Sequence, residues 1–175
     1  AYHAQKHGLQ ATVFEKRETL GGIVRNVIPG FRIGDDAIDN DIALIKKTGA
    51  EFVMGKEAPD VKELKAMGFD YIVLACGAEK KGRLNIEGSV MNVIDFLYAF
   101  KNGGELKLGR NVAVVGGGNT AMDAARAAKR AEGVEKVTLV YRRNRRYMPA
   151  DLEELELAIE DGVEFMELAS PVKQA

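Results

Sequence analysis

The second half of the chain alternates short apolar runs with segments of helical periodicity. Residues 111–115 and 136–141 are apolar runs of strand length, and the alanine-rich residues 119–131 between them have helical periodicity. Residues 151–160 place leucine and isoleucine on one helical face, and residues 163–168 alternate like a strand. Strands that alternate with helices in this way predict a parallel α/β sheet.

The first half follows a similar succession. Residues 1–7 resemble the last turns of a helix that ends near Gly8, and residues 11–15 are a short β-rich run. Residues 33–49 carry isoleucines at helical spacing. The continuous apolar run at residues 71–75 fits a strand that is buried on both faces.

A polar, glycine-bearing stretch at residues 101–110 separates these halves and is the best place for a linker. We therefore place the domain boundary near Leu108, which gives a first domain over residues 1–107 and a second over residues 108–175. The predicted fold is a Rossmann-like parallel sheet with helices on both faces.

Composition excludes several classes of function. A net charge of −1 leaves no excess of Lys and Arg for binding nucleic acid. The one cysteine, Cys76, cannot build an iron-sulfur cluster, a four-cysteine zinc site or a CxxC pair, and its place after an apolar run favours a buried structural thiol. His3 and His7 lack a third ligand, so we assign no metal. The absence of a membrane-length apolar run and of a secretory signal leads us to expect a cytoplasmic protein.

A glycine-rich motif carries the candidate chemistry. Residues 112–123 contain G-x-G-x-x-A directly after a predicted strand and at the start of a predicted helix. Gly116 permits the tight turn, Gly118 lets the backbone approach a pyrophosphate, and Ala121 lets the helix lie close to the strand. Free N–H groups at the helix start would face the phosphates. The predicted contacts to this dinucleotide are Gly116, Gly117, Gly118, Asn119, Thr120 and Ala121.

Basic residues follow the second strand of this predicted unit. An NAD site carries an acid there, whereas this chain has Arg142 and Arg143, with Arg145 and Arg146 close behind. Arginine attracts the 2′-phosphate that distinguishes NADP(H), so NADPH is favoured over NADH. The alternatives are an ordinary βα turn for the glycines, and a solvated or acid-paired charge run for the arginines. Both interpretations can hold for different arginines.

Taken together, these segments resemble the family of the glutamate synthase small (beta) subunit, which includes the electron-input domain of dihydropyrimidine dehydrogenase and selenate reductase subunits. The resemblance rests on Val13-Phe-Glu-Lys16 with Gly21-Gly22, Ile28-Pro-Gly-Phe-Arg32, Ala75-Cys-Gly77, the run from Gly116 to Asp123, and Tyr141-Arg-Arg143 with Met148-Pro149. It covers nearly the whole chain, and the combination is far more specific than any one motif.

The resemblance implies that an NADP-binding unit follows an incomplete FAD-binding unit and that hydride passes from NADPH to the flavin. Electrons would then leave through iron-sulfur clusters outside this chain, toward a partner subunit or domain. By the same likeness, Glu15 would bond the FAD ribose, and Gly21, Gly22, Arg32 and Gly77 would lie along the flavin. The alternatives without a cofactor role are a solvent-facing acid at a strand end for Glu15 and a plain turn for Gly77.

The resemblance also leads us to expect a fragment of a longer protein, because the first glycine-rich loop of the family would stand upstream of Glu15. The expected function is therefore an NADPH-dependent FAD oxidoreductase, with a non-catalytic nucleotide-binding fragment as the alternative. FAD binding by the isolated chain is doubtful on this interpretation. A flavin disulfide reductase is disfavoured because no CxxC is present. We assign no catalytic side chain, since the cofactors carry hydride transfer.

Overall fold

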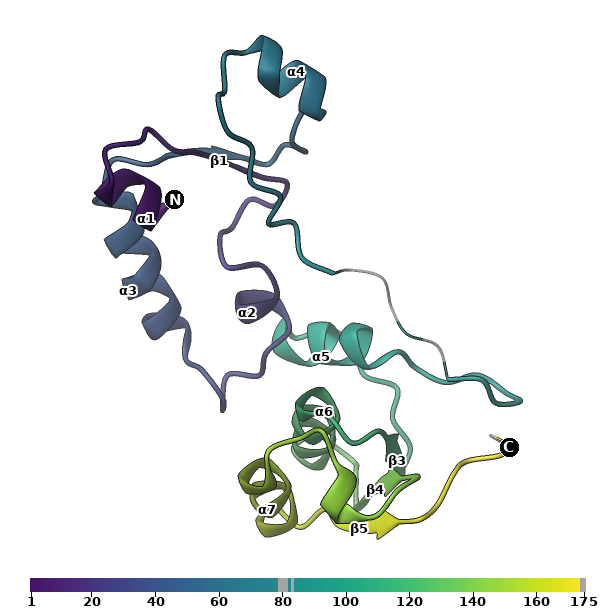
Figure 1. Ribbon diagram of the computed structural model, residues 1–175. Helices are drawn as coiled ribbons and strands as arrows, with labels where there is room; N and C mark the ends of the chain where they lie inside the picture. The colour runs from purple at the N-terminus through teal and green to yellow at the C-terminus, as the bar shows by residue number, and fades with distance from the viewer. Residues whose placement is uncertain (79–81, 83, 174–175) are drawn as a thin grey trace. The chain divides into compact units, whose positions relative to one another are not determined.

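A computed structural model describes residues 1–78, 82 and 84–173. Its contacts divide the chain into two compact units, one formed by residues 1–25 and 33–80 and the other by residues 26–32 and 81–175 (Figure 1). The boundary that we predicted near Leu108 thus lies inside the second unit. The chain enters this unit earlier because the helix over Val93–Lys101 places Phe96 and Leu97 in its core.

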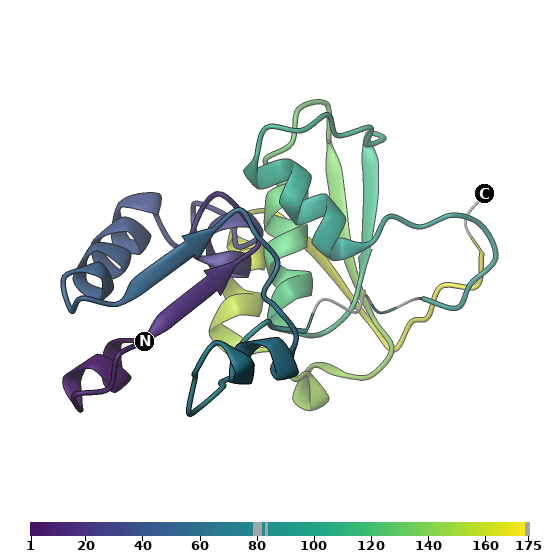
Figure 2. The same ribbon diagram turned by 90° about the horizontal axis from the view of Figure 1, so that it is seen from above.

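The first unit is built around two short parallel strands. Its elements are α1 (Tyr2–Lys6), β1 (Thr12–Glu15), α2 (Gly22–Asn26), α3 (Asp35–Lys46), β2 (Glu51–Met54) and α4 (Val61–Ala66). The strands β1 and β2 lie side by side in Figure 2, and Glu15 at the end of β1 is paired with Met54. The predicted helix at residues 1–7, the strand at 11–15 and the helix within 33–49 are confirmed. The strand β2 and the helices α2 and α4 were not predicted.

The predicted buried strand at residues 71–75 is wrong. This segment has no regular secondary structure, and Tyr71, Val73 and Leu74 are 81, 85 and 77% exposed. An apolar run forms a buried strand only where neighbouring strands accept its backbone hydrogen bonds, and no strand of the described residues pairs with it. Cys76, at the end of the run, is exposed for the same reason, so the prediction of a buried thiol is also wrong.

The second unit contains a parallel three-stranded sheet in the order β3-β4-β5. Its elements are α5 (Val93–Lys101), β3 (Asn111–Val115), α6 (Asn119–Lys129), β4 (Lys136–Tyr141), the 3-10 turn η1 (Arg145–Tyr147), α7 (Leu152–Glu160) and β5 (Glu164–Glu167). The predicted order strand, helix, strand, helix, strand is confirmed, and the fold is α/β with parallel sheets.

The sheet register decides which face the helices of this unit cover. Val112 and Val114 of β3 are paired with Val137 and Leu139 of β4. Val137 and Leu139 belong to the buried core that includes α6 residues, and Val112 and Val114 pack against that core. Met122 of α6 is fully buried there. The opposite face is exposed in the described part of the unit, where Val115 is 38% and Met166 is 50% exposed. We expected helices on both faces; polar residues such as Lys136 and Thr138 make the second face compatible with water.

The segment 26–32 belongs to the second unit although its neighbours in sequence belong to the first. Val27 is 5% exposed, Pro29 is fully buried, and the ring of Phe31 lies 4.8 and 4.5 Å from the guanidinium carbons of Arg126 and Arg130. The side chain of Asn102 at the end of α5 donates to the carbonyl of Asn26 at 2.9 Å. These contacts anchor the segment to α5 and α6.

Candidate dinucleotide site

A cavity of about 670 Å³ opens at the carboxyl ends of β3 and β4. Ligands of open parallel sheets bind at this edge, in the crevice outside the strand ends. Its lining residues come from the ends of strands and the loops after them: Leu84, Asn85, Ile86, Val115, Gly116, Gly117, Val140, Tyr141, Arg142, Arg143, Tyr147, Met148, Pro149, Ala169, Ser170 and Pro171. The structure therefore brings Gly116, Gly117, Arg142 and Arg143 together at one cavity.

The three glycines of the loop have different surroundings. A Cβ built on Gly116 would lie 2.9 Å from the Cβ of Ala121, so this glycine and this alanine let α6 start close to β3. A Cβ on Gly117 would overlap the ring of Tyr141. A Cβ on Gly118 would meet no atom within 4 Å. The space beside Gly118 is thus open, as an approaching pyrophosphate would require.

The first turn of α6 receives no cap from a side chain. The N-cap residue is Gly118, which has no side chain to cap the helix. The backbone N–H groups of Ala121 and Met122 donate to the carbonyl of Gly118 at 2.9 and 3.3 Å. Helix N-termini attract anions because their first N–H groups lack partners within the helix. Asn119 and Thr120 are exposed at this terminus.

The arginines after β4 differ in their surroundings. Arg142 and Arg143 are exposed and line the cavity. Arg145 instead forms an ion pair with Glu156 of α7 at 2.8 Å, while its backbone N–H donates to Glu167 at 2.6 Å. The alternative of acid-paired arginines thus holds for Arg145, and Arg142 and Arg143 remain available to a ligand phosphate.

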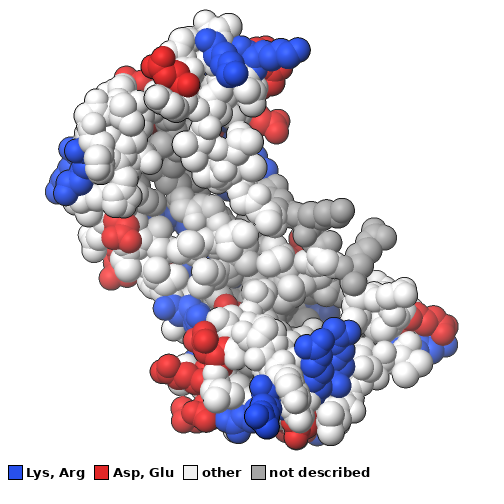
Figure 3. All heavy atoms as spheres, viewed as in Figure 1, with Lys and Arg blue, Asp and Glu red and all other residues white. Residues whose placement is uncertain are grey.

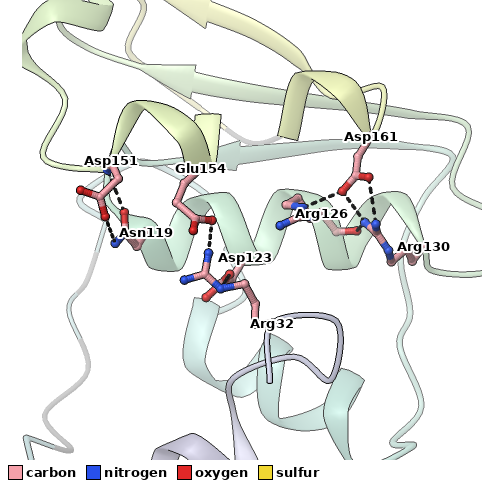
Figure 4. Close-up of polar contacts among 8 residues, drawn as sticks. All are labelled: Arg32, Asn119, Asp123, Arg126, Arg130, Asp151, Glu154 and Asp161. Carbon is pink, nitrogen blue, oxygen red and sulfur yellow. Dashed lines mark hydrogen bonds and ion pairs between the residues drawn. The ribbon is translucent and has the colours of Figure 1, made fainter. Parts of the chain in front are cut away.

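A second polar cluster lies between α6, α7 and the segment 26–32 (Figure 4). The guanidinium of Arg32 forms ion pairs with Glu154 and, at 3.5 Å, with Asp123. Burial raises the pKa of the Asp123 carboxyl, and the charges of Arg32 and Arg126 only partly oppose that effect. Arg32, which we expected along the flavin, is therefore engaged inside the second unit, whereas Gly21 and Gly22 belong to the first.

Asp161, at the C-terminal end of α7, binds two arginines at the C-terminal end of α6. Its carboxylate accepts hydrogen bonds from Arg126 at 2.6 Å and from both terminal nitrogens of Arg130 at 2.6 and 2.9 Å. The hydrogen bond from Arg130 is the main cause that lowers the pKa of Asp161 from its usual value to about 2. We name this three-residue contact, Arg126–Arg130–Asp161, the far clasp.

The first unit contains the other candidate flavin contacts: Glu15, Gly21, Gly22 and Gly77. Glu15 ends β1, is half-buried, and accepts a hydrogen bond from the backbone N–H of Arg17 at 2.9 Å. Gly21, Gly22 and Gly77 all have positive φ, at +114°, +50° and +77°. A Cβ on Gly22 or Gly77 would meet no atom within 4 Å, so both glycines leave open space beside the backbone.

Within residues 1–78, 82 and 84–173, no group of three or more His, Cys, Asp or Glu side chains is placed to hold a metal ion. In the same part of the chain, none of the helices combines the length and the apolar character that crossing a membrane requires. Lys and Arg are interspersed with Asp and Glu on the face shown in Figure 3.

The sequence profile of the pyridine nucleotide-disulphide oxidoreductase family matches residues 1–174. The chain belongs to this family. Among its relatives, "Putative oxidoreductase YgfK" of Escherichia coli K12 is 45% identical over 175 residues, which cover 97% of this chain and 17% of that protein. The "Glutamate synthase [NADPH] small chain" of Azospirillum brasilense is 30% identical over 184 residues, covering 94% of this chain and 38% of the relative. This chain thus spans less than half the length of either relative.

The fold of this pyridine nucleotide oxidoreductase chain is also found among solved structures. Mycobacterium tuberculosis FprA in complex with NADPH matches 95% of this chain and 54% of its own, with a TM-score of 0.73 and 19% identity. The expected resemblance to the glutamate synthase small subunit and the expected α/β class are both confirmed.

Two residues near the candidate site have contacts that the sequence did not predict. Tyr141 was counted as the end of a strand, yet its ring occupies the space beside Gly117, and its hydroxyl donates to the carbonyl of Tyr147 at 2.6 Å. Asp151 is the first residue of the helix predicted over residues 151–160, and the structure shows that it contacts Asn119. Both contacts join residues more than five positions apart, so no local pattern signals them.

Proposed function

We propose that the chain is part of an NADPH-dependent FAD oxidoreductase and serves as an electron-input module. NADPH would bind at the cavity of the second unit, FAD would be contacted by the first unit, and the electrons would continue to iron-sulfur clusters outside this chain. The observation that carries the proposal is the pair Arg142 and Arg143, which lines the cavity at the end of β4, where an NAD site would have an acid.

The residues present fit an NADPH dinucleotide. The open space beside Gly118 and the N-terminus of α6, which has no side-chain cap, suit the pyrophosphate. Arg142 and Arg143 suit the 2′-phosphate, because planar guanidinium groups form paired, charge-assisted hydrogen bonds with phosphate oxygens. Apolar residues of the lining, such as Ile86 and Pro171, would cover the flat face of the adenine.

The flavin contacts that we propose are Glu15 for the ribose and Gly21, Gly22 and Gly77 for close approach of the backbone. Glu15 stands at the carboxyl end of a parallel strand, the place where an acid binds ribose hydroxyls in folds of this kind. Arg32 makes a weaker candidate, because its guanidinium is already paired with Asp123 and Glu154. When both nucleotides are bound, they supply the hydride transfer, and the protein positions them and excludes water.

An electron-accepting subunit or domain is part of this proposal. It is supported by the glutamate synthase relative, whose name describes it as the small chain of an NADPH enzyme. A module that accepts a hydride and passes electrons onward needs no acid-base side chain of its own. This agrees with our assignment of no catalytic residue.

The test is rapid mixing of the full-length natural protein with NADPH or NADH without oxygen, while the absorbance of the oxidised flavin is followed. We expect NADPH to bleach the flavin. NADH should do so with a second-order rate constant of flavin reduction that is at least about tenfold lower, since a lost charge-assisted bond weakens binding by about that factor. Faster bleaching by NADH would contradict the choice of cofactor. Saturable binding of NADPH without bleaching would favour the alternative of a non-catalytic nucleotide-binding protein.

A further inference from the structure

The geometry points to Asp151 as a positioning residue for the cofactor's pyrophosphate, an inference that rests on the proposed function. Asp151 and Asn119 exchange two hydrogen bonds (Figure 4). The amide nitrogen of Asn119 donates to a carboxylate oxygen of Asp151 at 3.2 Å, and the backbone N–H of Asp151 donates to the amide oxygen of Asn119 at 3.1 Å. Asn119 is the first residue of α6, so Asp151 holds the turn that would face the phosphates.

Asp151 uses its side chain in an unusual way for its position. It is the N-cap residue of α7, where an aspartate ordinarily accepts hydrogen bonds from the first turn of its own helix. Here it makes no side-chain cap bond, and the carboxylate reaches across to α6. The chain gives up a cap on α7 and gains a contact to the glycine-rich loop.

Two other contacts join residues 147–151 to the glycine-rich loop. The backbone N–H of Ala150 donates to the carbonyl of Gly117 at 3.0 Å. The hydroxyl of Tyr141 donates to the carbonyl of Tyr147 at 2.6 Å, while its ring fills the space beside Gly117. Residues 147–151 and the glycine-rich loop therefore form one connected structure, and the side chain of Asp151 contacts the start of α6.

The charge of Asp151 disfavours binding of the pyrophosphate, whereas its hydrogen bond to Asn119 favours binding. A carboxylate beside a pyrophosphate repels it, whereas the ordered loop lowers the entropy that binding would otherwise cost. These two effects can be separated by substitution. Asp151→Asn keeps a side-chain oxygen that can accept from Asn119 and removes the charge. Asp151→Ala removes both the charge and the acceptor.

The experiment measures KM and kcat of the full-length protein with NADPH and with NADH, together with inhibition by 2′-AMP. The pyrophosphate is common to both cofactors and absent from 2′-AMP. We expect Asp151→Ala to raise both KM values by about three- to tenfold, the effect of one lost hydrogen bond, with little change in kcat. Asp151→Asn should keep both KM values at or below those of the wild type. Inhibition by 2′-AMP should not change in either variant.

Asp161→Asn is the matched control, because Asp161 is the other acid that joins α7 to α6. It should lower the melting temperature and leave both KM values unchanged. A KM increase in this control equal to that of Asp151→Ala, an unchanged KM in Asp151→Ala, or weaker 2′-AMP inhibition in Asp151→Ala would each overturn the positioning role. A wild-type protein that uses neither cofactor would instead overturn the proposed function.

Discussion

At the scale of single residues, the glycine-rich loop shows how much a motif can tell. The sequence predicted the turn, the helix after it and the close approach of Ala121, because G-x-G-x-x-A is a local pattern with a known geometry. It assigned Gly118 to the pyrophosphate but gave no separate role to Gly117, whose neighbour in the fold is the ring of Tyr141. The difference between the two glycines depends on Tyr141, which stands more than twenty positions away and reaches the loop only in the folded unit.

This difference predicts that one substitution in the loop lowers stability and another removes nucleotide binding. Gly117→Ala places a methyl group against the ring of Tyr141, and such overpacking costs about 1–3 kcal/mol of folding free energy. Gly118→Val should leave the fold intact, because Gly118 has φ −101° and ψ 169°, which valine adopts readily, and open space beside it.

Thermal unfolding and NADP⁺ titration would check both variants. Gly117→Ala should melt at a lower temperature than the wild type. Gly118→Val should melt near the wild type and lose nucleotide binding, since its side chain would occupy the space of the pyrophosphate. Retained affinity in Gly118→Val would mean that the phosphates bind elsewhere.

At the scale of elements, most of the second unit could be predicted, whereas β2, α2 and α4 of the first unit could not. The elements β3, β4 and α7 lie where hydrophobic periodicity placed them, because each has an apolar pattern that its neighbours in the chain help to bury. Residues 71–75 have the apolar pattern without a paired strand in the described residues, so composition alone was misleading there. Whether a strand forms depends on its partners, which a single segment does not encode.

The far clasp between α6 and α7 makes stability depend on pH. The pKa of Asp161 is lowered from its usual value to about 2, so its ion pairs stabilise the folded state above about pH 4. That contribution is lost as the pH falls toward 2, when the folded state must also take up the proton. Asp123 has a raised pKa and changes stability in the opposite direction over its own range.

Comparison with Asp161→Asn isolates the contribution of Asp161. Urea unfolding at pH 7, 4 and 2 should show the wild type more stable than the variant at pH 7. The difference should shrink between pH 4 and 2. A difference that stays constant over this range would show that the charge of Asp161 contributes nothing.

At the scale of the whole molecule, the division into units differs from the division that the linker composition suggested. The glycine-bearing residues 101–110 lie within the second unit, and the segment 26–32 joins that unit from a distant part of the sequence. Composition marks where the chain is polar, whereas domain membership depends on long-range contacts such as that of Phe31 with Arg126 and Arg130.

Phe31→Ala tests this assignment by hydrogen exchange. Loss of the half-buried ring should cost about 2 kcal/mol, less than the cost of a fully buried phenylalanine. Exchange should increase in α5, α6 and α7 and stay unchanged in β1 and β2. The matched control is Ile23→Ala, which changes an exposed residue of α2 and should not affect α6. Increased exchange confined to β1 and β2 in Phe31→Ala would assign the segment to the first unit instead.

The proposed selection of NADPH by Arg142 and Arg143 can be tested by one set of kinetic measurements. The values needed are kcat/KM for NADPH and for NADH in the full-length wild type, in the double variant Arg142→Ala/Arg143→Ala and in a control, Arg110→Ala/Lys136→Ala. The control removes the same charge from the opposite ends of β3 and β4, where exposed ion pairs with Glu135 and Glu164 contribute little. We predict that the first double variant loses about tenfold to a hundredfold in kcat/KM with NADPH, mainly through KM, and almost nothing with NADH, while the control keeps the preference for NADPH. Equal losses with both cofactors, or a wild type that prefers NADH, would show that Arg142 and Arg143 do not select NADPH.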